Sequence, residues 1–425
     1  MKAIVLAAGK GVRLEPLTLT KPKNLIPVGG KPILQHLLST IKASGVKEVL
    51  LIIGYGGNQI RRAFGDGSQL GLNIQYERQT RISGTGNALS VAKSYVNNED
   101  FLMVYGDLYI ETSVVVKVLT AYRKKKANFM AVAEAERVED FGLVKIQKSG
   151  KILDLLEKPK QIKTPNLVNA GVCIFSPRIF EKIAKTEKSP RGEIEITDAI
   201  RLMVKSGENF YAVKVNKESW MDIGRPWDLL TANEHFLKRM KPASKGIVEK
   251  GAHLTGKICI EKDVVVKAGS YIEGPVLICQ GSKIGPNCYL RPYTTIGRNV
   301  KIGNGCEIKN SIIMDGTRIP HLSYVGDSII GENCNLGAGT IVGNIRFDDK
   351  SVKVKIKDEV VDSKRRKLGV IIGDNVKTGI NVSFMPGLKV GPNCHIGANV
   401  VVYRDISSNV KVSLKQNLVF EKLEK

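Results

Sequence analysis

The chain has 425 residues, 43% of them hydrophobic, which exceeds the usual size of a single domain and is enough to bury two cores. Lysine and arginine outnumber aspartate and glutamate by 65 to 41, so the net charge of +24 favours anionic partners. The basic residues are spread along the chain and aromatic residues make up only 6%, which argues against a nucleic-acid-binding surface.

No apolar segment approaches membrane-spanning length, and the N-terminus leads directly into a strand instead of a signal peptide. We therefore expect a cytoplasmic protein that does not contact membranes. Cysteine is present at seven positions without a CxxC pair, so neither a zinc site nor a disulfide framework is indicated.

The first predicted element is a buried strand, Ala3–Ala8, which ends at Gly9 and Gly11. Because glycine lacks a Cβ atom, the backbone N–H groups of such a loop can surround phosphate oxygens. Arg13 and Lys23 would add positive charge there. A Walker loop would require Gly-Lys-Ser/Thr, and a dinucleotide fingerprint would require a third glycine, so neither standard motif is present.

Alternating apolar runs and amphipathic stretches predict an α/β, Rossmann-like domain over residues 1–239. The clearest predicted strands are Val49–Ile53 and Phe101–Tyr105, and the clearest predicted helices are Gly86–Ser94 and Thr112–Lys125. Ligands of such sheets lie at the carboxyl ends of the strands. Asp107 and Asp222 each follow an apolar stretch, and two carboxylates together with substrate phosphates suit Mg²⁺.

The stretch Leu6–Leu34 contains, in order, a spaced Gly-x-Gly, Arg13, Pro16, Lys21-Pro22-Lys23 and Gly30-Lys31-Pro32. As an ordered set it resembles the signature of the sugar-1-phosphate nucleotidylyltransferases, and it departs from that signature at Val12, where many members carry threonine. The resemblance implies nucleotide contacts at Ala8, Gly9, Gly11, Gln79, Gly84 and Thr85. It also implies a sugar-phosphate pocket at Gly142, Glu157, Lys158 and Asn169, with Asp107 and Asp222 as the metal ligands.

The implied reaction is in-line attack of a sugar phosphate on the α-phosphate of a nucleoside triphosphate, which needs positioning and charge neutralisation but no covalent intermediate. Arg13 and Lys23 would stabilise the leaving pyrophosphate, and Lys158 the attacking phosphate. Mg²⁺ on Asp107 and Asp222 would stabilise the pentavalent phosphorus. Aspartate at 222 matches the glucose-1-phosphate branch, whereas the bacterial acetylglucosamine branch more often has asparagine, so the sugar stays open.

Residues 240–249, which are basic and include Pro242 and Gly246, are predicted as a linker. From Leu254 to Ile308 an aliphatic residue stands at every sixth position, and this register returns later in the chain. Spacing of this length predicts a parallel β-helix over residues 250–425. Four cysteines share one phase of the repeat and are predicted to be small buried packing residues: Cys288, Cys306, Cys334 and Cys394.

Two interruptions break the predicted ladder, and active residues often lie where loops leave a rigid scaffold. The first contains the string Arg318–Asp327. The repeats resemble the left-handed hexapeptide-repeat acyltransferases, which are typically trimers with sites between subunits. The string resembles the catalytic loop of the acetyltransferase half of the bifunctional UDP-N-acetylglucosamine enzymes.

This second resemblance implies that His321 is the base that removes a proton from the amino group before the amine attacks acetyl-CoA. It implies sugar-phosphate contacts at Arg291 and Lys309, amino-sugar contacts at Tyr324, Asn335 and Asn344, and an acetyl-CoA cleft at Ala338 and Ala398. Ile380 stands where bacterial members use a serine near coenzyme A.

The second interruption, Ile345–Val370, alternates Val352, Val354 and Ile356 with lysines. It is predicted to form an edge hairpin whose lysines discourage pairing with other chains. The alternative, that these lysines reach coenzyme A phosphates, stays open.

We therefore expect an α/β nucleotidyltransferase domain followed by a left-handed parallel β-helix, joined in a homotrimer. The expected enzyme acetylates glucosamine-1-phosphate or galactosamine-1-phosphate with acetyl-CoA. It also transfers a nucleotidyl group from UTP or dTTP to the N-acetylamino sugar-1-phosphate or to glucose-1-phosphate. Two alternatives are a nucleotidylyltransferase with a purely structural β-helix, as in mannose-1-phosphate guanylyltransferases, and a non-catalytic regulatory subunit.

Overall fold

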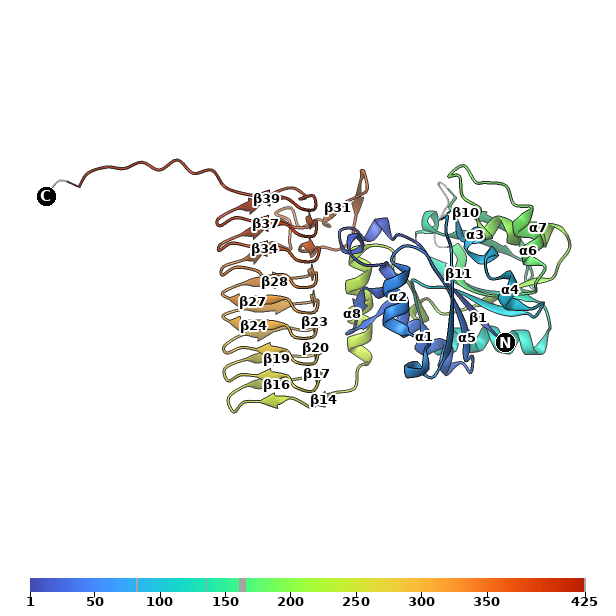
Figure 1. Cartoon of the computed structure of the whole chain (residues 1–425), viewed down its shortest axis with the longest axis horizontal. Coiled ribbons are helices and arrows are strands. Elements are labelled where there is room, and N and C mark those ends of the chain that lie inside the picture. The colour runs from blue at the N-terminus through green and yellow to red at the C-terminus, as the bar shows by residue number, and fades with distance from the viewer. Residues whose placement is uncertain (82, 136, 160–165, 424–425) are drawn as a thin grey trace. The chain divides into compact units, whose positions relative to one another are not determined.

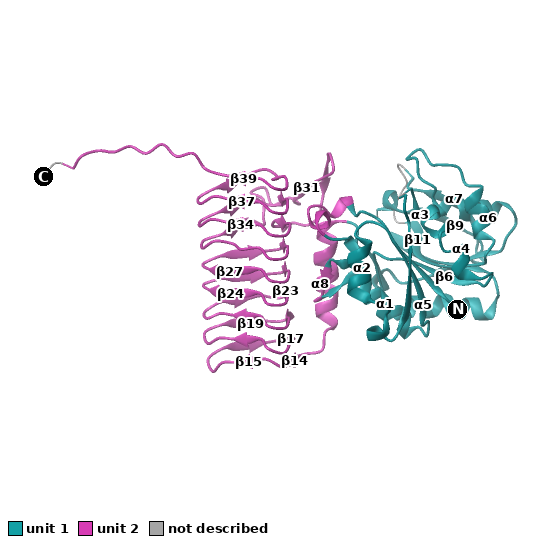
Figure 2. Cartoon of the chain, viewed as in Figure 1, with its two compact units in different colours: residues 1–11, 21–26, 31–224 teal, residues 12–20, 27–30, 225–425 magenta. Residues whose placement is uncertain are grey.

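The computed structural model describes residues 1–81, 83–135, 137–159 and 166–423, which divide into two compact units (Figure 2). Unit 1 comprises Met1–Gly11, Lys21–Ile26 and Lys31–Gly224. Unit 2 comprises Val12–Thr20, Pro27–Gly30 and Arg225–Lys425. All of the candidate site residues named above are described.

Unit 1 is built on a mixed sheet with the strand order β10-β9-β11-β6-β1-β4-β5, in which β8 also pairs with β11 and β12 (Figure 1). Its strands are β1 (Ala3–Ala7), β4 (Glu48–Ile53), β5 (Asn73–Arg78), β6 (Phe101–Tyr105), β8 (Asn128–Ala135), β9 (Gly142–Ile146), β10 (Ile152–Glu157), β11 (Asn166–Phe175) and β12 (Phe210–Lys214). Shorter strands are β2 (Pro27–Val28), β3 (Lys31–Pro32), β7 (Leu108–Ile110) and β13 (Trp220–Asp222). The neighbours β6, β1, β4 and β5 run parallel, so their carboxyl ends share one edge.

The central strand β1 shows why this sheet needs helices on both faces. Ala3, Val5 and Ala7 belong to one apolar core, and Ile4 and Leu6 belong to another on the opposite face. The helices are α1 (Ile33–Ala43), α2 (Gly57–Phe64), α3 (Thr85–Ser90), α4 (Lys93–Val96), α5 (Thr112–Lys124), α6 (Ile179–Ala184) and α7 (Ile196–Lys205). Helices α1, α2 and α5 contribute to the first core, and α3, α4, α6 and α7 to the second.

The predicted helix Gly86–Ser94 is wrong as a single helix. It is divided into α3, which ends at Ser90, and α4, which begins at Lys93. The Ala92 N–H bonds to the Leu89 carbonyl, three residues back, so the chain tightens into a turn between them.

Unit 2 contains helix α8 (Pro226–Arg239) and a left-handed parallel β-helix with three sheets (Figure 1). The first sheet is β14 (Ala243–Ser244), β17 (Ile258–Ile260), β20 (Val276–Ile278), β23 (Thr294–Ile296), β26 (Ile312–Ile313), β29 (Ile329–Ile330), β33 (Ile371–Ile372) and β36 (Lys389–Val390). The second is β15 (Ile247–Val248), β18 (Val265–Val266), β21 (Lys283–Ile284), β24 (Lys301–Asn304) and β27 (Arg318–His321), continued by β34 (Lys377–Thr378), β37 (His395–Ile396) and β39 (Lys411–Val412). The third is β16 (His253–Thr255), β19 (Tyr271–Glu273), β22 (Tyr289–Leu290), β25 (Glu307–Lys309), β28 (Tyr324–Gly326), β30 (Ile341–Val342), β35 (Ser383–Phe384) and β38 (Val401–Val402).

The six-residue period predicted from the sequence is confirmed. Ile272 pairs with Leu290, and Leu290 with Ile308, so one coil takes 18 residues. Residues in this phase fill the interior and are almost fully buried, and each contributes roughly 1.5–3 kcal/mol of hydrophobic stabilisation. Leu254, at 38% exposure, is the exception because it lies in the first coil. The four cysteines named above are also buried, as predicted.

The first predicted interruption is wrong, because the ladder continues through it. Ile313, Ile319 and Val325 are fully buried interior residues. The step from Ile308 to Ile313 and the step from Val325 to Ile330 are each one residue shorter than the repeat. The string Arg318–Asp327 therefore forms strands β27 and β28 of the solenoid rather than a loop.

The second predicted interruption does leave the ladder. It contains an antiparallel hairpin, β31 (Lys353–Ile356) and β32 (Glu359–Asp362), as the alternating pattern predicted. The expected linker, 240–249, holds β14 and β15, which already pair with β17 and β18.

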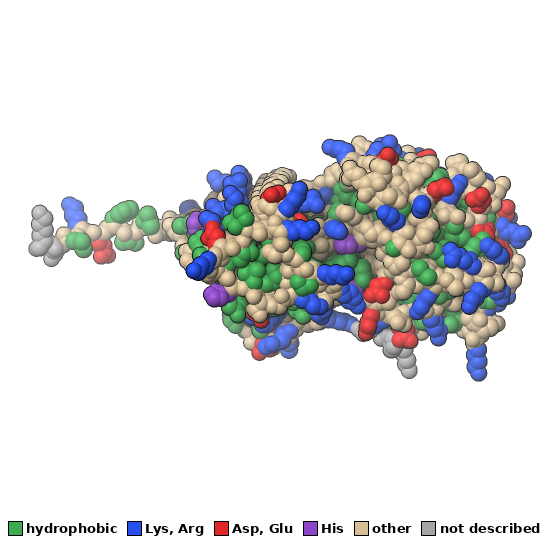
Figure 3. All heavy atoms as spheres, turned by 90° about the horizontal axis from the view of Figure 1, so that it is seen from below, with side chains coloured by type: hydrophobic (Ala, Val, Ile, Leu, Met, Phe, Trp, Pro, Cys, Tyr) green, Lys and Arg blue, Asp and Glu red, His purple; other side chains and the backbone are tan. Residues whose placement is uncertain are grey.

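The surface of the molecule is rich in basic side chains. On the face shown in Figure 3, lysine and arginine side chains are scattered over the surface instead of gathering in one patch. In the part of the chain that the structure describes, no helix combines the length and hydropathy that crossing a membrane requires.

Candidate functional site

In unit 1, Lys23 and Asp107 lie beyond the carboxyl ends of β1 and β6. The Lys23 ammonium donates a hydrogen bond to the Asp107 carboxylate. A Cβ atom at Gly9 would lie 3.6 Å from the Lys23 Nζ, so the lysine lies against the glycine-bearing loop. Gly106 lets the ends of the two strands meet, because a Cβ atom there would lie 2.8 Å from the Leu6 carbonyl oxygen.

Asp222 is brought next to this pair by a short antiparallel ladder. Strand β13 pairs with β7, and Asp222 lies opposite Leu108, the neighbour of Asp107. The Ile223 N–H also donates to the Asp107 carbonyl at 3.4 Å. The two aspartates come from positions far apart in the sequence, and the β7–β13 ladder brings their backbones together beyond the end of β6.

Arg13 belongs to unit 2, within the 3₁₀ turn Val12–Leu14. Ala8 is buried at the end of β1 and Gly11 has a φ of 68°, a backbone conformation that favours glycine.

Gln79, Gly84 and Thr85 come together at the start of α3. The Gln79 amide nitrogen donates to the Gly84 carbonyl at 3.2 Å, and the Gln79 side chain is 4% exposed. Gly84 has a φ of 104°, and a Cβ atom there would lie 2.4 Å from the Ile194 carbonyl oxygen. The Thr85 hydroxyl accepts a hydrogen bond from the Ile196 N–H at 3.0 Å. No side chain is accommodated at Gly84, because the Ile194 backbone occupies the position that a Cβ atom would take.

The predicted sugar-phosphate residues also meet. Gly142 lies opposite Glu157 in the β9–β10 pair, and Val168 lies opposite Leu143, so Asn169 lies next to Gly142. The Lys158 Nζ is 3.9 Å from the Glu157 carboxylate.

Three residues that the sequence did not indicate complete this cluster. Arg191 donates to Glu157 at 3.3 Å and to Glu195 at 2.6 Å, and the Thr197 hydroxyl donates to Glu157 at 2.7 Å. Burial, and next the charge of Glu157, raise the pKa of Glu195 to about 7. These residues lie at and just before α7, in a stretch whose charges follow no helix or strand period.

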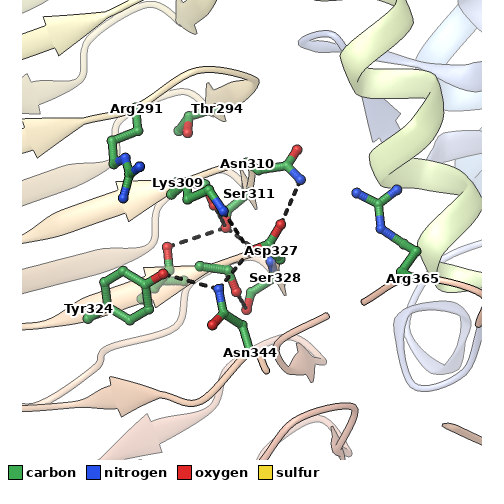
Figure 4. Close-up of polar contacts among 12 residues, drawn as sticks. Arg291, Thr294, Lys309, Asn310, Ser311, Tyr324, Asp327, Ser328, Asn344 and Arg365 are labelled. Carbon is green, nitrogen blue, oxygen red and sulfur yellow. Dashed lines mark hydrogen bonds and ion pairs between the residues drawn. The ribbon is translucent and has the colours of Figure 1, made fainter. Parts of the chain in front are cut away.

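In unit 2, four candidate residues lie in, or within two residues of, the strands that four consecutive coils contribute to the third sheet: Arg291, Lys309, Tyr324 and Asn344 (Figure 4). The Arg291 guanidinium donates to Glu307 at 2.8 Å and lies 5.5 Å from the centre of the Tyr289 ring. Its Nε is buried without a hydrogen-bond partner among the described residues. A cationic donor in this state suits an anionic ligand.

The Tyr324 hydroxyl accepts a hydrogen bond from the Asn344 amide at 3.1 Å. Burial is the main cause that raises the pKa of Tyr324, so the hydroxyl stays protonated at neutral pH. Lys309 donates to Asp327 at 3.3 Å. Asp327 and Glu307, which hold the two cations, were not predicted as site residues, because a lone acid in a turn or on a strand surface is usually structural.

His321 lies at the end of β27 and is exposed. The registers of the third sheet place Ala338, Ile380 and Ala398 at the same position in the next coils. Backbone hydrogen bonds follow this stack, from Gly339 N–H to the His321 carbonyl and from Asn381 N–H to the Ala338 carbonyl. The histidine and the predicted coenzyme A residues therefore share one edge of the solenoid.

Asn335 is apart from the other predicted amino-sugar residues. It lies on the second sheet, in bridges with Arg318 and Lys377, whereas Tyr324 and Asn344 lie with the third sheet. Within one chain, the candidate residues therefore occupy two sides of the solenoid.

Three family models match parts of the chain. Residues 2–239 match the model described as nucleotidyl transferase. Residues 272–379 match a model described as the GMPPB C-terminal domain, and residues 369–404 match the bacterial transferase hexapeptide model.

Relatives match over the whole length. The chain is 48% identical over 424 residues to the "Bifunctional protein GlmU" of Methanocaldococcus jannaschii, which covers 100% of both chains. It is 40% identical over 410 residues to the "Bifunctional sugar-1-phosphate nucleotidylyltransferase/acetyltransferase" of Sulfurisphaera tokodaii, which covers 96% of this chain and 98% of the relative. A solved structure of UDP-glucose pyrophosphorylase complexed with UDP-glucose is 26% identical with a TM-score of 0.52, and covers 56% of this chain and 99% of that one. The chain therefore belongs to the family of bifunctional enzymes that join a sugar-1-phosphate nucleotidylyltransferase domain to a hexapeptide-repeat acetyltransferase domain.

Proposed function

We propose that this enzyme uses acetyl-CoA to acetylate an amino-sugar-1-phosphate, either glucosamine-1-phosphate or galactosamine-1-phosphate, and couples the product to a uridine or thymidine nucleotide. The observation that carries this proposal is the stack of His321, Ala338 and Ala398 along one edge of the solenoid, beside a sheet that carries Arg291 and Lys309. The reaction requires a base, a surface that binds the thioester and cations that bind the sugar phosphate. The stack and the sheet supply all three kinds of group.

In the acetyl transfer, the neutral His321 imidazole accepts a proton from the substrate ammonium group, which frees the nitrogen lone pair. The amine nitrogen then bonds to the acetyl carbonyl carbon, and the carbon–sulfur bond breaks. The second proton of the nitrogen passes to the leaving sulfur, so the products are the amide and coenzyme A thiol. Arg291 and Lys309 bind the sugar phosphate, and Tyr324, Asn335 and Asn344 bind the sugar. Because Asn335 lies on another sheet, neighbouring subunits of a homotrimer would complete each site.

In the nucleotidyl transfer, Lys158 orients the attacking sugar phosphate, and Lys23 and Arg13 stabilise the leaving pyrophosphate. Asp107 and Asp222 fit a magnesium site, because the β7–β13 ladder brings these two carboxylate residues together and Mg²⁺ is commonly held by one or two carboxylates together with substrate phosphates and water. When bound there, the metal ion supplies charge neutralisation at the reacting phosphate. Ala8, Gly9, Gly11, Gln79, Gly84 and Thr85 contact the nucleotide, and Gly142, Glu157 and Asn169 contact the sugar.

The proposal also assigns the nucleotidyltransferase domain to residues 1–239 and the acetyltransferase domain to residues 250–425, and it places the enzyme in the cytoplasm.

A substrate panel tests the two activities separately. Release of coenzyme A thiol is measured with each amino-sugar-1-phosphate, and release of pyrophosphate is measured with UTP or dTTP, with and without Mg²⁺. Pyrophosphate release without any thiol release would favour the alternative in which the β-helix is structural.

We expect His321→Ala to lower acetyl transfer by about 100-fold or more, since general bases commonly contribute that much. Nucleotidyl transfer to N-acetylglucosamine-1-phosphate should stay at the wild-type rate. His395→Ala, another exposed histidine of the solenoid, is the matched control. Equal loss of both activities in a folded His321→Ala protein would contradict two separate sites.

A further inference from the structure

Asp327 is a buried carboxylate at the centre of the polar cluster in unit 2 (Figure 4). It follows β28 directly, is 3% exposed, and has a φ of 52°. Its Oδ2 accepts hydrogen bonds from the Lys309 ammonium at 3.3 Å and the Asn344 amide at 2.6 Å. Its Oδ1 accepts one from the Asn310 amide at 2.8 Å.

These partners come from the neighbouring coils on either side. Lys309 and Asn310 belong to the coil before Asp327, and Asn344 belongs to the coil after it. Two of them, Lys309 and Asn344, are residues of the proposed amino-sugar site. Gly326 makes room for this arrangement, because a Cβ atom there would lie 2.4 Å from the Tyr324 hydroxyl and 2.6 Å from the Asn344 amide nitrogen.

The solenoid itself does not require an acid at this turn. The same turn between the third and first sheets contains Pro292-Tyr293 in an earlier coil and Pro386-Gly387 in a later one. One coil before Asp327, Asn310 occupies the equivalent position with a φ of 44°. The step between interior residues is also one residue shorter than the repeat at both turns. Asparagine can therefore adopt the left-handed backbone conformation at this position. Because burying a charge costs free energy, the stability of the fold does not explain why an aspartate is present.

The carboxylate has two effects on its neighbours. It holds the Lys309 ammonium in place while leaving further N–H donors for a ligand, since a lysine has three. The Asp327 carboxylate and the Tyr324 hydroxyl each accept a hydrogen bond from the side-chain amide nitrogen of Asn344. The side-chain carbonyl oxygen of Asn344 is therefore turned away from Asp327 and Tyr324. That oxygen is an acceptor suited to an ammonium or hydroxyl group.

We propose that Asp327 is a positioning residue for acetyl transfer, which orients Lys309 toward the sugar phosphate and Asn344 toward the amino sugar. This inference rests on the proposed function, because it takes both residues to contact the substrate. Asp327 itself makes no contact with the substrate and acts only through them.

The test is Asp327→Asn, which keeps the size of the side chain and the backbone conformation that Asn310 adopts. In Asp327→Asn, an amide nitrogen replaces one carboxylate oxygen. This nitrogen cannot accept the hydrogen bonds that the oxygen accepted from neighbouring N–H groups. We expect the KM for glucosamine-1-phosphate to rise about 30-fold, in the range of losing a hydrogen bond to a charged group, with the KM for acetyl-CoA unchanged. The effect should shrink with unphosphorylated glucosamine, because Lys309 then has no phosphate to bind.

Lys309→Met provides the second arm. In that background, Asp327→Asn should add little to the KM, because the residue through which the carboxylate acts is gone. The double variant removes both charges, so its melting temperature should return toward that of the wild type while the KM stays high. This keeps the test valid if Asp327→Asn alone is unstable.

Asp374→Asn is the matched control. Asp374 is another buried aspartate of the solenoid, 5% exposed, and its carboxylate accepts hydrogen bonds from the Glu332 N–H and the Thr20 hydroxyl. Its KM for glucosamine-1-phosphate should stay at the wild-type value. A wild-type KM in Asp327→Asn beside an impaired Lys309→Met would overturn the positioning role alone. A wild-type enzyme that releases no thiol would overturn the proposed function and this inference with it.

Discussion

Glu195 is a single residue whose ionisation is controlled by the site around it. Its side chain is 4% exposed and accepts a hydrogen bond from Arg191 at 2.6 Å. Burial, followed by the charge of Glu157, raises its pKa from 4.5 to about 7, although the Arg191 charge acts in the opposite direction. The folded protein therefore holds a proton that the unfolded chain releases between these two pH values.

This difference predicts a pH dependence of stability. The stabilisation linked to neutral Glu195 is present below pH 4.5 and is lost as the pH rises to about 7. The side chain of Glu195→Gln cannot ionise, so the variant should lose less stability than the wild type between pH 4.5 and 7. The difference in unfolding free energy should be no more than about 3 kcal/mol, and it should appear as a shallower decline of the melting temperature. The measurement is thermal unfolding across this range, with the exposed Glu218→Gln as control. Parallel curves for wild type and Glu195→Gln would contradict the raised pKa.

At the scale of elements, the hairpin β31–β32 has two different faces. Val352, Val354 and Ile356 are 1%, 1% and 7% exposed, and a Cβ atom at Gly387 would lie 2.5 Å from a Val352 methyl carbon. The hairpin thus covers its apolar face against its own unit, and Lys353 and Lys355 lie exposed on the other face. Nearby, Arg365 donates to Glu234 of α8 at 2.8 Å.

Two substitutions on adjacent positions of β31 separate these faces. Val354→Asp buries a charge and should lower the free energy of unfolding by about 3 kcal/mol, measured by denaturant titration. Lys355→Asp, on the exposed face, should change it by less than about 0.5 kcal/mol. The KM of the Lys355→Asp protein for acetyl-CoA tests the remaining alternative for the lysines. An unchanged KM would favour a solvated face, and a raised one would favour contact with coenzyme A phosphates.

The same elements explain how far the sequence could predict the fold and the site. The six-residue period was readable because each interior residue must fill the same narrow space, so Ile272, Leu290 and Ile308 are all aliphatic. A one-residue deletion, as between Ile308 and Ile313, looks like an interruption in a strict count, although the interior residue simply arrives one position early. Asp327 escaped notice because its partners lie about one coil away, and an isolated aspartate after a glycine is typical of a turn.

At the scale of the whole molecule, the third sheet presents a row of outward side chains. In register, these are His253, Tyr271, Tyr289, Glu307, Tyr324, Ile341, Ser383 and Val401. Tyr271, Ile341 and Val401 are 46%, 44% and 44% exposed, and the rings of Tyr271 and Tyr289 pack edge to face. Exposed apolar rows of this kind are typical of interfaces between proteins. Since Asn335 lies on a different sheet from Tyr324, assembly through this row would bring a second copy of the chain to each acetyl-transfer site.

A charge placed in this row should therefore separate the two activities. Tyr271→Glu lies outside the proposed acetyl site, and we expect it to convert the proposed trimer to monomers, as measured by light scattering after size exclusion. Acetyl transfer per chain should fall by more than about tenfold and recover as protein concentration rises, because assembly follows mass action. Nucleotidyl transfer should stay at the wild-type rate, since its residues lie elsewhere in the chain. Leu153→Glu, at a residue 50% exposed in unit 1, is the control. A monomeric Tyr271→Glu protein with full acetyl transfer would show that one chain suffices, and Asn335 would then have no part in the sugar site.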